Sequence, residues 1–311
     1  MLGVLAGFFV VWSIIGVGWF VGRRKILGEN AGPTLSRLAF FVASPALLFE
    51  TLSKARLEDV LGPQLAVAAI GGTAVGVAYH LVSKLLLKRE TPESIIGAMS
   101  ASQANSANLG IPIAVYVLGD ASYVAPLLIF QLAFYNPINL MLLDATLGTR
   151  STRQNPVLKF LLIIVRNPVI MASALALILS ALHLKLPDLV LQPIHFIGGA
   201  AVPAMLMSFG MSLNGNRPLA AASGRRVDIL VASSFKLILH PVLAFLAAHF
   251  LLGLEGHALF AATIAGALPT AQNVFVAASR YQQGVTVAKD TVLITTVIAV
   301  PAMIVIASFL H

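Results

Sequence analysis

The first residues able to do chemistry lie in a polar stretch, SASQANSANLGIP, at 100–112. Its side chains Asn105 and Asn108 offer amide donors and acceptors, and the stretch ends on Gly110 and Pro112. Unpaired amides and a broken backbone cost several kcal/mol per group in hydrocarbon, so in an apolar chain such a stretch persists only where it faces protein or a water-filled cavity. The stretch therefore indicates an interior site.

A second polar stretch, GALPTAQNVF, occupies 266–275. Pro269 has no N–H and clashes with the preceding turn, so a helix should break there. The half-helix after the break would direct N–H groups and a partial positive charge into the protein, which suits a carboxylate without a buried Lys or Arg. Thr270, Gln272 and Asn273 would add hydroxyl and amide donors at the same place.

The composition indicates which class of protein contains these stretches. Of 311 residues, 58% are hydrophobic and 10% are charged, and the mean hydropathy is +0.91. A soluble domain carries about 25% charged residues, so the chain is predicted to be a polytopic membrane protein whose main partner is the lipid bilayer. The sequence has no Cys, which excludes disulfides and thiolate sites.

Ten apolar runs predict an all-α protein with ten transmembrane helices. The predicted spans are 2–22, 35–53, 61–84, 94–118, 122–146, 160–182, 189–213, 227–252, 257–280 and 286–310. Most of the 20 Lys and Arg fall in the odd-numbered gaps, so by the positive-inside rule these gaps are cytoplasmic and both termini lie outside. Loop topology thus explains the net charge of +8, and no nucleic-acid partner is expected.

The two halves of the chain repeat several features in the same order. ASPALL at 43–48 is echoed by AVPAML at 201–206, and spans five and ten each carry a central proline, Pro137 and Pro301. Because each half has an odd number of spans, the second half would enter the membrane from the opposite side, as in many secondary transporters. The predicted parts are a first five-helix repeat at 1–146, a cytoplasmic connector at 147–159 and a second, inverted repeat at 160–311.

Few ionisable side chains lie inside the predicted spans. Four fall toward span ends: Arg37, Glu50, Asp144 and Lys236. We expect these side chains to reach the membrane surface. Lys236 and His240 are one turn apart in span eight, where a packed, neutral histidine is favoured over a proton relay. No acidic pair lies at the centre of any span, so the usual device for binding a coupling cation is missing.

NSANLGIP at 105–112 and ALPTAQNVF at 267–275, with RNP at 166–168, resemble the auxin efflux carrier family of bacterial and plant carriers. The resemblance extends over the whole chain in span order. It implies two inverted five-helix repeats in which broken helices four and nine cross at their prolines, here Pro112 and Pro269. It also implies a small organic anion as substrate, such as indole acetate in plants and malonate or malate in bacteria.

The resemblance also implies site residues. The amide beside the first break matches Asn105 or Asn108, and Gln131, Tyr135 and Asn136 in span five are similar to pocket residues of the plant carriers. The expected substrate-binding residues are Asn105, Asn108, Gly110, Pro112, Gln131, Tyr135, Asn136, Pro269, Thr270, Gln272 and Asn273. No catalytic residue, metal site or cofactor is expected, and a bacterial inner membrane is the expected location. A proton or sodium coupling ion and a homodimer are left open.

The favoured function is a secondary active or facilitative transporter of small carboxylates, working by alternating access around the crossing of helices four and nine. An anion channel or gated pore is the alternative, but it needs a continuous polar lining, whereas polarity here is concentrated in two stretches. A sodium-coupled symporter of a larger organic anion is a further alternative. An enzyme is not expected, because the sequence lacks Cys and the Gly-x-Ser-x-Gly and His-Glu-x-x-His motifs.

Overall fold

The computed structural model describes residues 2–55, 57–147, 156–184, 186–214 and 224–310. Within these ranges the backbone is helical apart from connecting segments and an isolated antiparallel bridge between Ala104 and Thr270. The described part of the chain is therefore all-α, as the sequence predicts. A helix pairs its backbone groups internally, which is what a segment in hydrocarbon requires.

Several of the described helical segments are apolar enough to cross a membrane. Seven are also long enough: Ala6–Arg23, Ala31–Lys54, Pro63–Leu85, Ala121–Thr146, Asp188–Ser212, Arg226–Leu251 and Val285–Leu310. Three apolar helices are shorter: Ser106–Leu118, Pro168–Ala181 and Gly256–Ala267. The chain is thus an integral membrane protein. Ten complete spans stay a prediction, because the three short helices have fewer than the about 20 residues that a bilayer core requires.

The helices group into two compact units, and each unit combines segments from both halves of the chain. The first unit contains Met1–Leu65, Ser106–Ile129 and Leu161–Gly215, and the second contains Ala66–Asn105, Phe130–Phe160 and Asn216–His311. Predicted spans one and two therefore share a unit with spans six and seven, and span three shares a unit with spans eight to ten. An inverted repeat would group equivalent spans in this way, while the repeat and its boundaries stay predictions.

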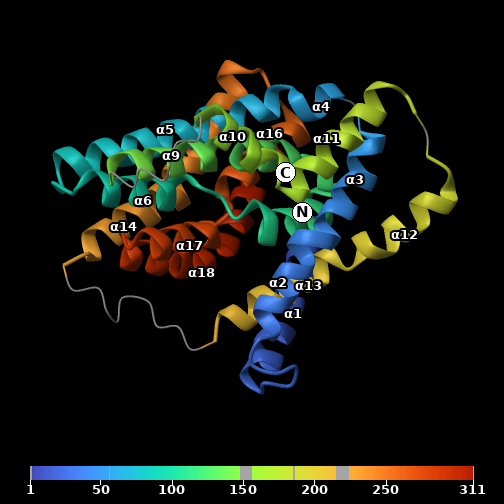
Figure 1. Cartoon of the computed structure of the whole chain (residues 1–311), viewed down its shortest axis with the longest axis horizontal. Helices are drawn as coiled ribbons and strands as arrows, with labels where there is room; N and C mark the ends of the chain where they lie inside the picture. The colour runs from blue at the N-terminus through green and yellow to red at the C-terminus, as the bar shows by residue number, and fades with distance from the viewer. Residues whose placement is uncertain (1, 56, 148–155, 185, 215–223, 311) are drawn as a thin grey trace. The chain divides into compact units, whose positions relative to one another are not determined.

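In the first unit, helices from both halves of the chain pack side by side. Its helices are α1 (Leu2–Arg23), α2 (Ala31–Leu38), η1 (Ala39–Ala43), α3 (Ser44–Lys54), α4 (Leu57–Leu61), η2 (Ser106–Gly110), α7 (Ile111–Ile113), η3 (Ala114–Leu118), η4 (Ala121–Val124), α8 (Ala125–Ile129), α11 (Pro168–Ala181), α12 (Asp188–Gly199) and α13 (Ala201–Ser212). α1 packs along α13, and α3 packs against α11 and α12 (Figure 1). Gly210 allows the close approach of α13 to α1, since an added Cβ would overlap the carbonyl oxygen of Ile15.

The RNP motif at 166–168 begins a helix. α10 (Pro156–Val165) ends just before it, and α11 starts at Pro168. Asn167 Oδ1 accepts hydrogen bonds from two first-turn N–H groups of α11, at 3.0 and 3.3 Å. Pro168 takes the first helical position, where its missing N–H costs nothing. The span predicted at 160–182 is therefore two helices, because this N-cap interrupts it.

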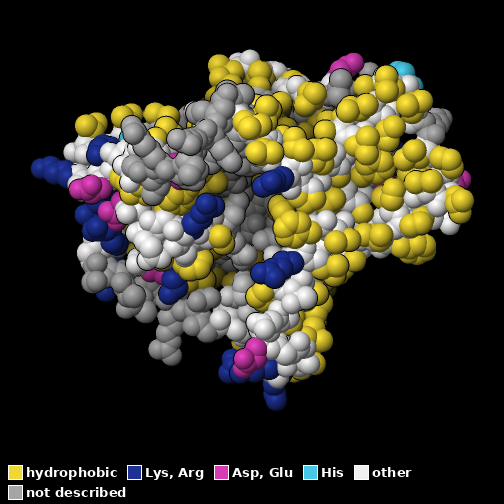
Figure 2. Space-filling view, viewed as in Figure 1, with side chains coloured by type: hydrophobic (Ala, Val, Ile, Leu, Met, Phe, Trp, Pro, Cys, Tyr) yellow, Lys and Arg dark blue, Asp and Glu magenta, His cyan; other side chains and the backbone are white. Residues whose placement is uncertain are grey.

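Apolar side chains cover much of the outer surface of the first unit. Figure 2 shows hydrophobic side chains gathered over α3, α11 and α12. Phe41, Leu175, Leu189 and Phe196 are among the exposed large hydrophobic residues. In water such a surface would promote aggregation, whereas in a bilayer it contacts lipid chains.

The second unit packs its helices around one long helix, α18 (Val285–Leu310). The other helices are α5 (Pro63–Leu85), α6 (Thr91–Ser102), η5 (Phe130–Tyr135), α9 (Asn136–Thr146), α14 (Arg226–Ser234), η6 (Phe235–Leu239), α15 (His240–Leu246), η7 (Ala247–Leu251), α16 (Gly256–Ala267) and α17 (Gln272–Tyr281). α6, α14, α16 and α17 all pack against α18. Ile96, Met99, Val274 and Ala288 belong to a buried cluster that joins α6, α17 and α18.

Helices four and nine of the sequence prediction are both broken by short extended segments. α6 ends at Ser102, and the next helix begins at Ser106 after Gln103–Asn105. α16 ends at Ala267, and α17 begins after Leu268–Ala271. Pro269 lies in the second break, as its missing N–H predicts.

The break in predicted helix four does not lie at Pro112, where the sequence predicts it. Pro112 lies inside the helix Ser106–Leu118, several residues after the break. The backbone on both sides of it, η2 and η3, is π-helical, and this altered hydrogen-bond spacing accommodates a residue without an N–H. The first break is therefore not at Pro112, because the extended segment is Gln103–Asn105. A crossing at Pro112 itself stays a prediction.

Candidate functional site

The two extended segments cross within the second unit. Asn105 N donates to Pro269 O at 2.7 Å, and Ala271 N donates to Gln103 O at 3.0 Å. These two bonds form the isolated bridge. Each segment thus supplies partners for backbone groups that the other segment's break has removed from a helix, as burial in an apolar interior requires.

Thr270 ties the crossing to two helices. It is fully buried, its N donates to Thr295 Oγ1 at 3.0 Å, and its Oγ1 donates to Ser100 O at 2.7 Å. Thr295 is in turn bonded to the carbonyl of Thr291, one turn earlier in α18. The hydroxyl proton of Thr270, which the sequence offers as a substrate donor, is therefore used to hold the crossing.

Two predicted residues from η5 and α9 hold the first extended segment. The Gln131 amide lies against the backbone of Ala104, with its nitrogen 2.8 Å from Ala104 O and its oxygen 3.1 Å from Ala104 N in the orientation that satisfies both groups. Asn136 Oδ1 accepts a hydrogen bond from Gln103 Nε2 at 2.8 Å. These side chains fix the shape of the break.

Tyr135, a third predicted residue, packs beside them. Its hydroxyl lies 2.5 Å from Ser102 Oγ, at the last residue of α6. Gly76 on α5 faces this hydroxyl so closely that an added Cβ would overlap it. The structure therefore brings Gln131, Tyr135 and Asn136 together at the first break.

Two further predicted residues lie where α17 begins. Gln272 is half-buried and Asn273 is exposed. Ala271, the N-cap residue, provides no side-chain cap. The partially positive end of α17 therefore begins directly at the crossing without a capping side chain from that residue, which suits an anion.

The other three predicted residues belong to the first unit. Gly110 and Pro112 are buried there, and Asn108 is half-buried. The hydrogen bonds of the crossing given above all join residues of the second unit, so the roles of these three residues stay predictions from the sequence.

Buried oxygen atoms without a partner lie on the elements that meet at the crossing. Among the described residues, three such atoms have no hydrogen-bond partner: Gln103 Oε1, Thr291 Oγ1 and Thr296 Oγ1. A buried polar group of this kind costs about 1–3 kcal/mol unless a ligand, ion or water pairs with it. The threonine hydroxyls are able to donate to a carboxylate.

Lys236 is buried inside the protein, so the prediction that its side chain reaches the membrane surface is wrong. It is fully buried, its Nζ donates to Gly266 O at 3.0 Å and lies 2.6 Å from His240 Nδ1. About ten residues of helix, or about 15 Å, separate it from the start of α14 at Arg226, which is half of a 30 Å bilayer core. Its carbonyl and imidazole partners explain why it lies inside the protein.

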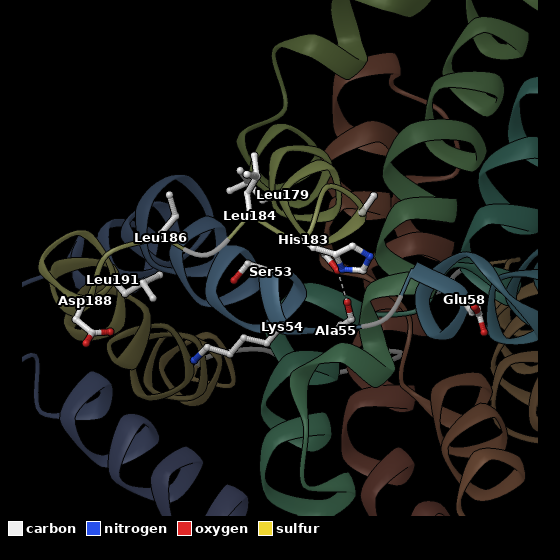
Figure 3. Close-up of a pocket in the computed structure, with 12 residues that line it drawn as sticks. Ser53, Lys54, Ala55, Glu58, Leu179, His183, Leu184, Leu186, Asp188 and Leu191 are labelled. Atoms are coloured by element: carbon white, nitrogen blue, oxygen red, sulfur yellow. Dashed lines mark hydrogen bonds between the residues drawn. The ribbon is translucent and has the colours of Figure 1, made fainter.

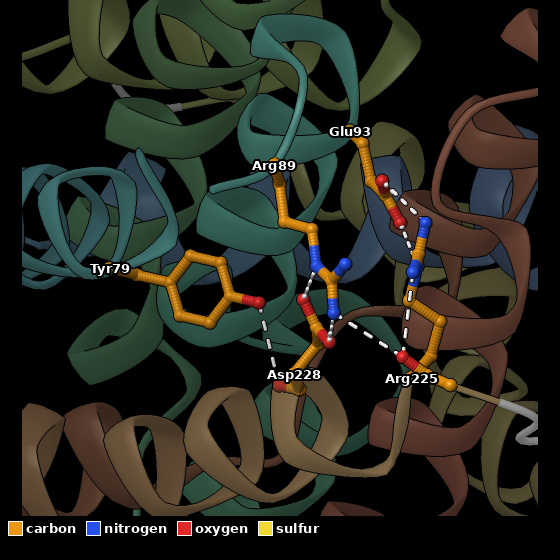
Figure 4. Close-up of polar contacts among 6 residues, drawn as sticks. Tyr79, Arg89, Glu93, Arg225 and Asp228 are labelled. Atoms are coloured by element: carbon orange, nitrogen blue, oxygen red, sulfur yellow. Dashed lines mark hydrogen bonds and ion pairs between the residues drawn. The ribbon is translucent and has the colours of Figure 1, made fainter. Parts of the chain in front are cut away.

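A charged cluster joins the turn between α5 and α6 to the start of α14 (Figure 4). Arg89 donates twice to the Asp228 carboxylate, both at 2.8 Å, and Arg225 Nε donates to Glu93 Oε1 at 2.5 Å. The hydrogen bond to Asp228 raises the pKa of Arg89 above its ordinary value. Bidentate Arg–carboxylate pairs are geometrically specific, so the cluster fixes how these helices meet.

A pocket of about 830 Å³ lies in the first unit, where α3 and α4 meet the connection between α11 and α12 (Figure 3). Lys54, Glu58, His183 and Asp188 are among its lining residues. Ser180 Oγ donates to Ala55 O across it, at 2.6 Å. None of the predicted substrate-binding residues lines this pocket among the residues that the structure describes.

Sequence reasoning missed two residues that the structure places at the second break. Thr295 accepts the backbone N–H of Thr270, and Lys236 donates to Gly266 O. The spacing of Thr291 and Thr295, one helical turn apart in an apolar span, was a signal for the first. The position of Lys236 well inside its span was a signal for the second.

The sequence matches a family model described as membrane transport protein over residues 4–307. The chain is 27% identical over 303 residues to a protein of Rhizobium meliloti (strain 1021) with the name "Putative malonate transporter". That alignment covers 96% of this chain and 92% of the relative.

Two further relatives have names that specify no substrate. An uncharacterized transporter of Methanocaldococcus jannaschii is 26% identical over 302 residues, which is 92% of each chain. An uncharacterized transporter of Escherichia coli (strain K12) is 27% identical over 271 residues, which is 85% of this chain and 84% of the relative. The family and the names of these relatives indicate a transporter and not an enzyme.

Proposed function

The chain belongs to the membrane transport protein family, the auxin efflux carrier family that its motifs resemble, and on this premise we propose that it carries a small carboxylate across the membrane. Transport proceeds by alternating access around the crossing of the two broken helices. We place the carrier in a bacterial inner membrane. Both termini lie outside the cytoplasm, as the distribution of Lys and Arg predicts.

The single observation that supports this function most is the crossing itself. Main-chain hydrogen bonds from Asn105 to Pro269 and from Ala271 to Gln103 hold two helix breaks together in a membrane protein. Inside the hydrocarbon core of a membrane, non-helical backbone is tolerated only where protein buries it or where it lines a cavity. In transporters, half-helix ends of this kind bind the charged groups of the substrate.

Donor chemistry at the crossing favours an anion. The N-terminal end of α17 carries a partial positive charge, and the amides of Gln272 and Asn273 lie in its first turn. The hydroxyls of Thr291 and Thr296 are buried and unpaired among the described residues. A carboxylate accepts hydrogen bonds from all of these groups.

Malonate is the first substrate to test, because the name of one relative specifies it. The experiment uses the purified chain in proteoliposomes loaded with unlabelled malonate, with labelled malonate outside and equal pH on both sides. A carrier gives saturable uptake that internal malonate stimulates. A channel gives neither saturation at low millimolar concentrations nor this stimulation, and that result would overturn the proposal.

A pair of matched variants tests the site. Asn273→Ala removes an amide from the first turn of α17 and should lower malonate exchange about tenfold or more, because a hydrogen bond to a charged group contributes about 1.5–3 kcal/mol. Asn30→Ala is the control, since Asn30 is exposed at the start of α2 and its side chain caps nothing there. Equal exchange in both variants would exclude Asn273 from the site.

A further inference from the structure

The buried amine of Lys236 is unusual because its hydrogen-bond partners among the described residues are a backbone carbonyl and an imidazole. Nζ lies 3.0 Å from Gly266 O and 2.6 Å from His240 Nδ1, and both side chains are at most 2% exposed. Neither partner carries the full negative charge that normally accompanies a buried ammonium group. Among the described residues the amine is therefore held by uncharged groups and not in an ion pair.

The carbonyl that Lys236 contacts is one that the helix break sets free. In a continuous helix Gly266 O would accept from the N–H four residues later, at Thr270. Here Thr270 N donates to Thr295 Oγ1 instead, at 3.0 Å. Lys236 thus replaces the lost helical donor at the end of α16.

The geometry of α15 makes this contact close. An added Cβ at Gly266 would lie 2.8 Å from Ala244 Cβ and 3.2 Å from Pro241 Cα, so only glycine allows α16 to approach α15 this far. The C-terminal end of a helix carries a partial negative charge, which favours an ammonium group over an amine. Protonated Lys236 is therefore a cation built into the second break.

His240 and the elements around it complete the environment. η6, which carries Lys236, packs against α6, α14, α15, α16 and α18. Besides His240, the titratable and charged side chains on these elements are Glu93, Arg226, Asp228, His257, Lys289 and Asp290. Glu93 and Asp228 are paired with Arg225 and Arg89. Tyr79 on α5 packs against Phe235, the residue before Lys236, with the two ring centroids 6.0 Å apart.

We propose that Lys236, together with His240, is a proton-binding site that couples anion transport to a proton gradient. On the side where the anion enters, an O–H bond of a hydronium ion breaks as the N–H bond to Lys236 Nζ forms, and a water molecule is left. On the other side that N–H bond breaks and a water molecule accepts the proton. His240 Nδ1 accepts a hydrogen bond from the ammonium form. No other bond changes, and no oxidation occurs.

The coupling follows from linkage, and it rests on the proposed carboxylate transport. A positive charge at the break of α16 attracts an anion bound at the crossing, so the protonated form binds the anion more tightly. By reciprocity the bound anion holds the proton more tightly, and both are carried in the same direction. The protonated amine of Lys236 also donates to Gly266 O, a carbonyl oxygen that would otherwise be available to coordinate a sodium ion.

The test uses the purified full chain in proteoliposomes that contain a pH-sensitive dye, with the membrane potential clamped at zero. For the wild type, external malonate should acidify the lumen, and an inward proton gradient should drive malonate uptake at least several-fold above its level at equal pH. Malonate exchange at equal pH is measured on the same preparation. Sodium should change neither signal.

Two substitutions separate a proton carrier from a structural cap. Lys236→Arg keeps a positive donor at Gly266 O but a guanidinium does not release its proton, so exchange should persist while acidification and gradient-driven uptake are lost. Lys236→Gln keeps only a neutral donor and should also lose proton movement. Lys88→Gln, on the exposed turn after α5, is the control and should behave as the wild type.

The outcomes distinguish the two proposals. Two results would overturn the proton site without contradicting carboxylate transport. One is malonate exchange without acidification in the wild type, and the other is equal acidification in the wild type and Lys236→Arg. Absence of both exchange and acidification in the wild type would overturn the carboxylate carrier and with it the coupling. Thermal unfolding of each variant in detergent shows whether it is folded, and if Lys236→Arg is unfolded, Lys236→Gln decides.

Discussion

Asn105 and Pro269 come from opposite halves of the chain, yet the N–H of one donates to the carbonyl of the other at 2.7 Å. The bond exists because each residue lies in a break between two half-helices, where the backbone has lost its helical partners. A buried peptide group must find another partner, and here each break supplies partners to the other. The two breaks therefore depend on each other.

Pro269→Ala tests whether the second break creates the anion site. The new N–H at position 269 is able to pair with the carbonyl of Ala265, which favours a continuous helix from α16 into α17 and removes the positive helix end. We expect the malonate dissociation constant to rise about tenfold, or about 1.4 kcal/mol. Isothermal titration of the detergent-solubilised protein measures it. Pro301→Ala in α18 is the control, and an unchanged constant for Pro269→Ala would contradict the account of the helix end.

Gln131→Leu tests the support of the first break. The substitution leaves the N–H and the carbonyl of Ala104 without their side-chain partner, at about 1–3 kcal/mol for each buried group. The unfolding temperature should fall and malonate exchange should slow. Gln192→Leu, at an exposed position on α12, provides a matched comparison. If both variants exchange malonate at the wild-type rate, Gln131 does not support the site.

Asp228→Asn tests the charged cluster. The Asp228 side chain is 2% exposed and the Arg89 side chain is 23% exposed, so removing the carboxylate charge leaves a half-buried guanidinium without a carboxylate partner. The free energy of unfolding should fall by about 3 kcal/mol. Glu29→Gln breaks the exposed Lys25–Glu29 pair and should cost less than about 1 kcal/mol. Denaturant unfolding of both variants compares them, and equal losses would refute the assignment of Arg89–Asp228 as a structural pair.

Asn167→Ala tests the start of α11. Its Oδ1 accepts two first-turn N–H groups, and loss of such an N-cap costs about 1 kcal/mol. The unfolding temperature should fall slightly, while malonate exchange per folded molecule stays unchanged. Asn167→Asp keeps the acceptor and should restore the stability. A large loss of exchange in Asn167→Ala with full stability would mean that the RNP motif acts in transport.

The sequence predicts the helical class, the apolar spans and the break at Pro269 because these follow from local physics. Hydrophobic runs and a missing N–H act wherever they occur in the chain. The first break could not be located from Pro112, since π-helical backbone around it absorbs the missing donor. A proline permits a break, whereas the surrounding packing decides whether one forms.

The site was predicted less completely for a related reason. The family resemblance predicts that Gln131, Tyr135 and Asn136 bind the substrate. The structure places all three at the first break, and their role in binding stays a prediction. Their partners Ala104, Ser102 and Gln103 depend on tertiary contacts that no spacing along the chain reveals. The same is true of Lys236, because its burial depends on a carbonyl that becomes available only after α16 ends.

The bridge between the two extended segments uses only main-chain atoms of Asn105, Pro269, Ala271 and Gln103. Because this bridge, which we call the frame, is made of main-chain atoms, it depends little on the identity of neighbouring side chains. Substitutions at Gln272 and Asn273, in the first turn of α17, are therefore free to alter selectivity while the frame stays intact. Protein engineers could retarget the carrier to other acids from a small library at these two positions.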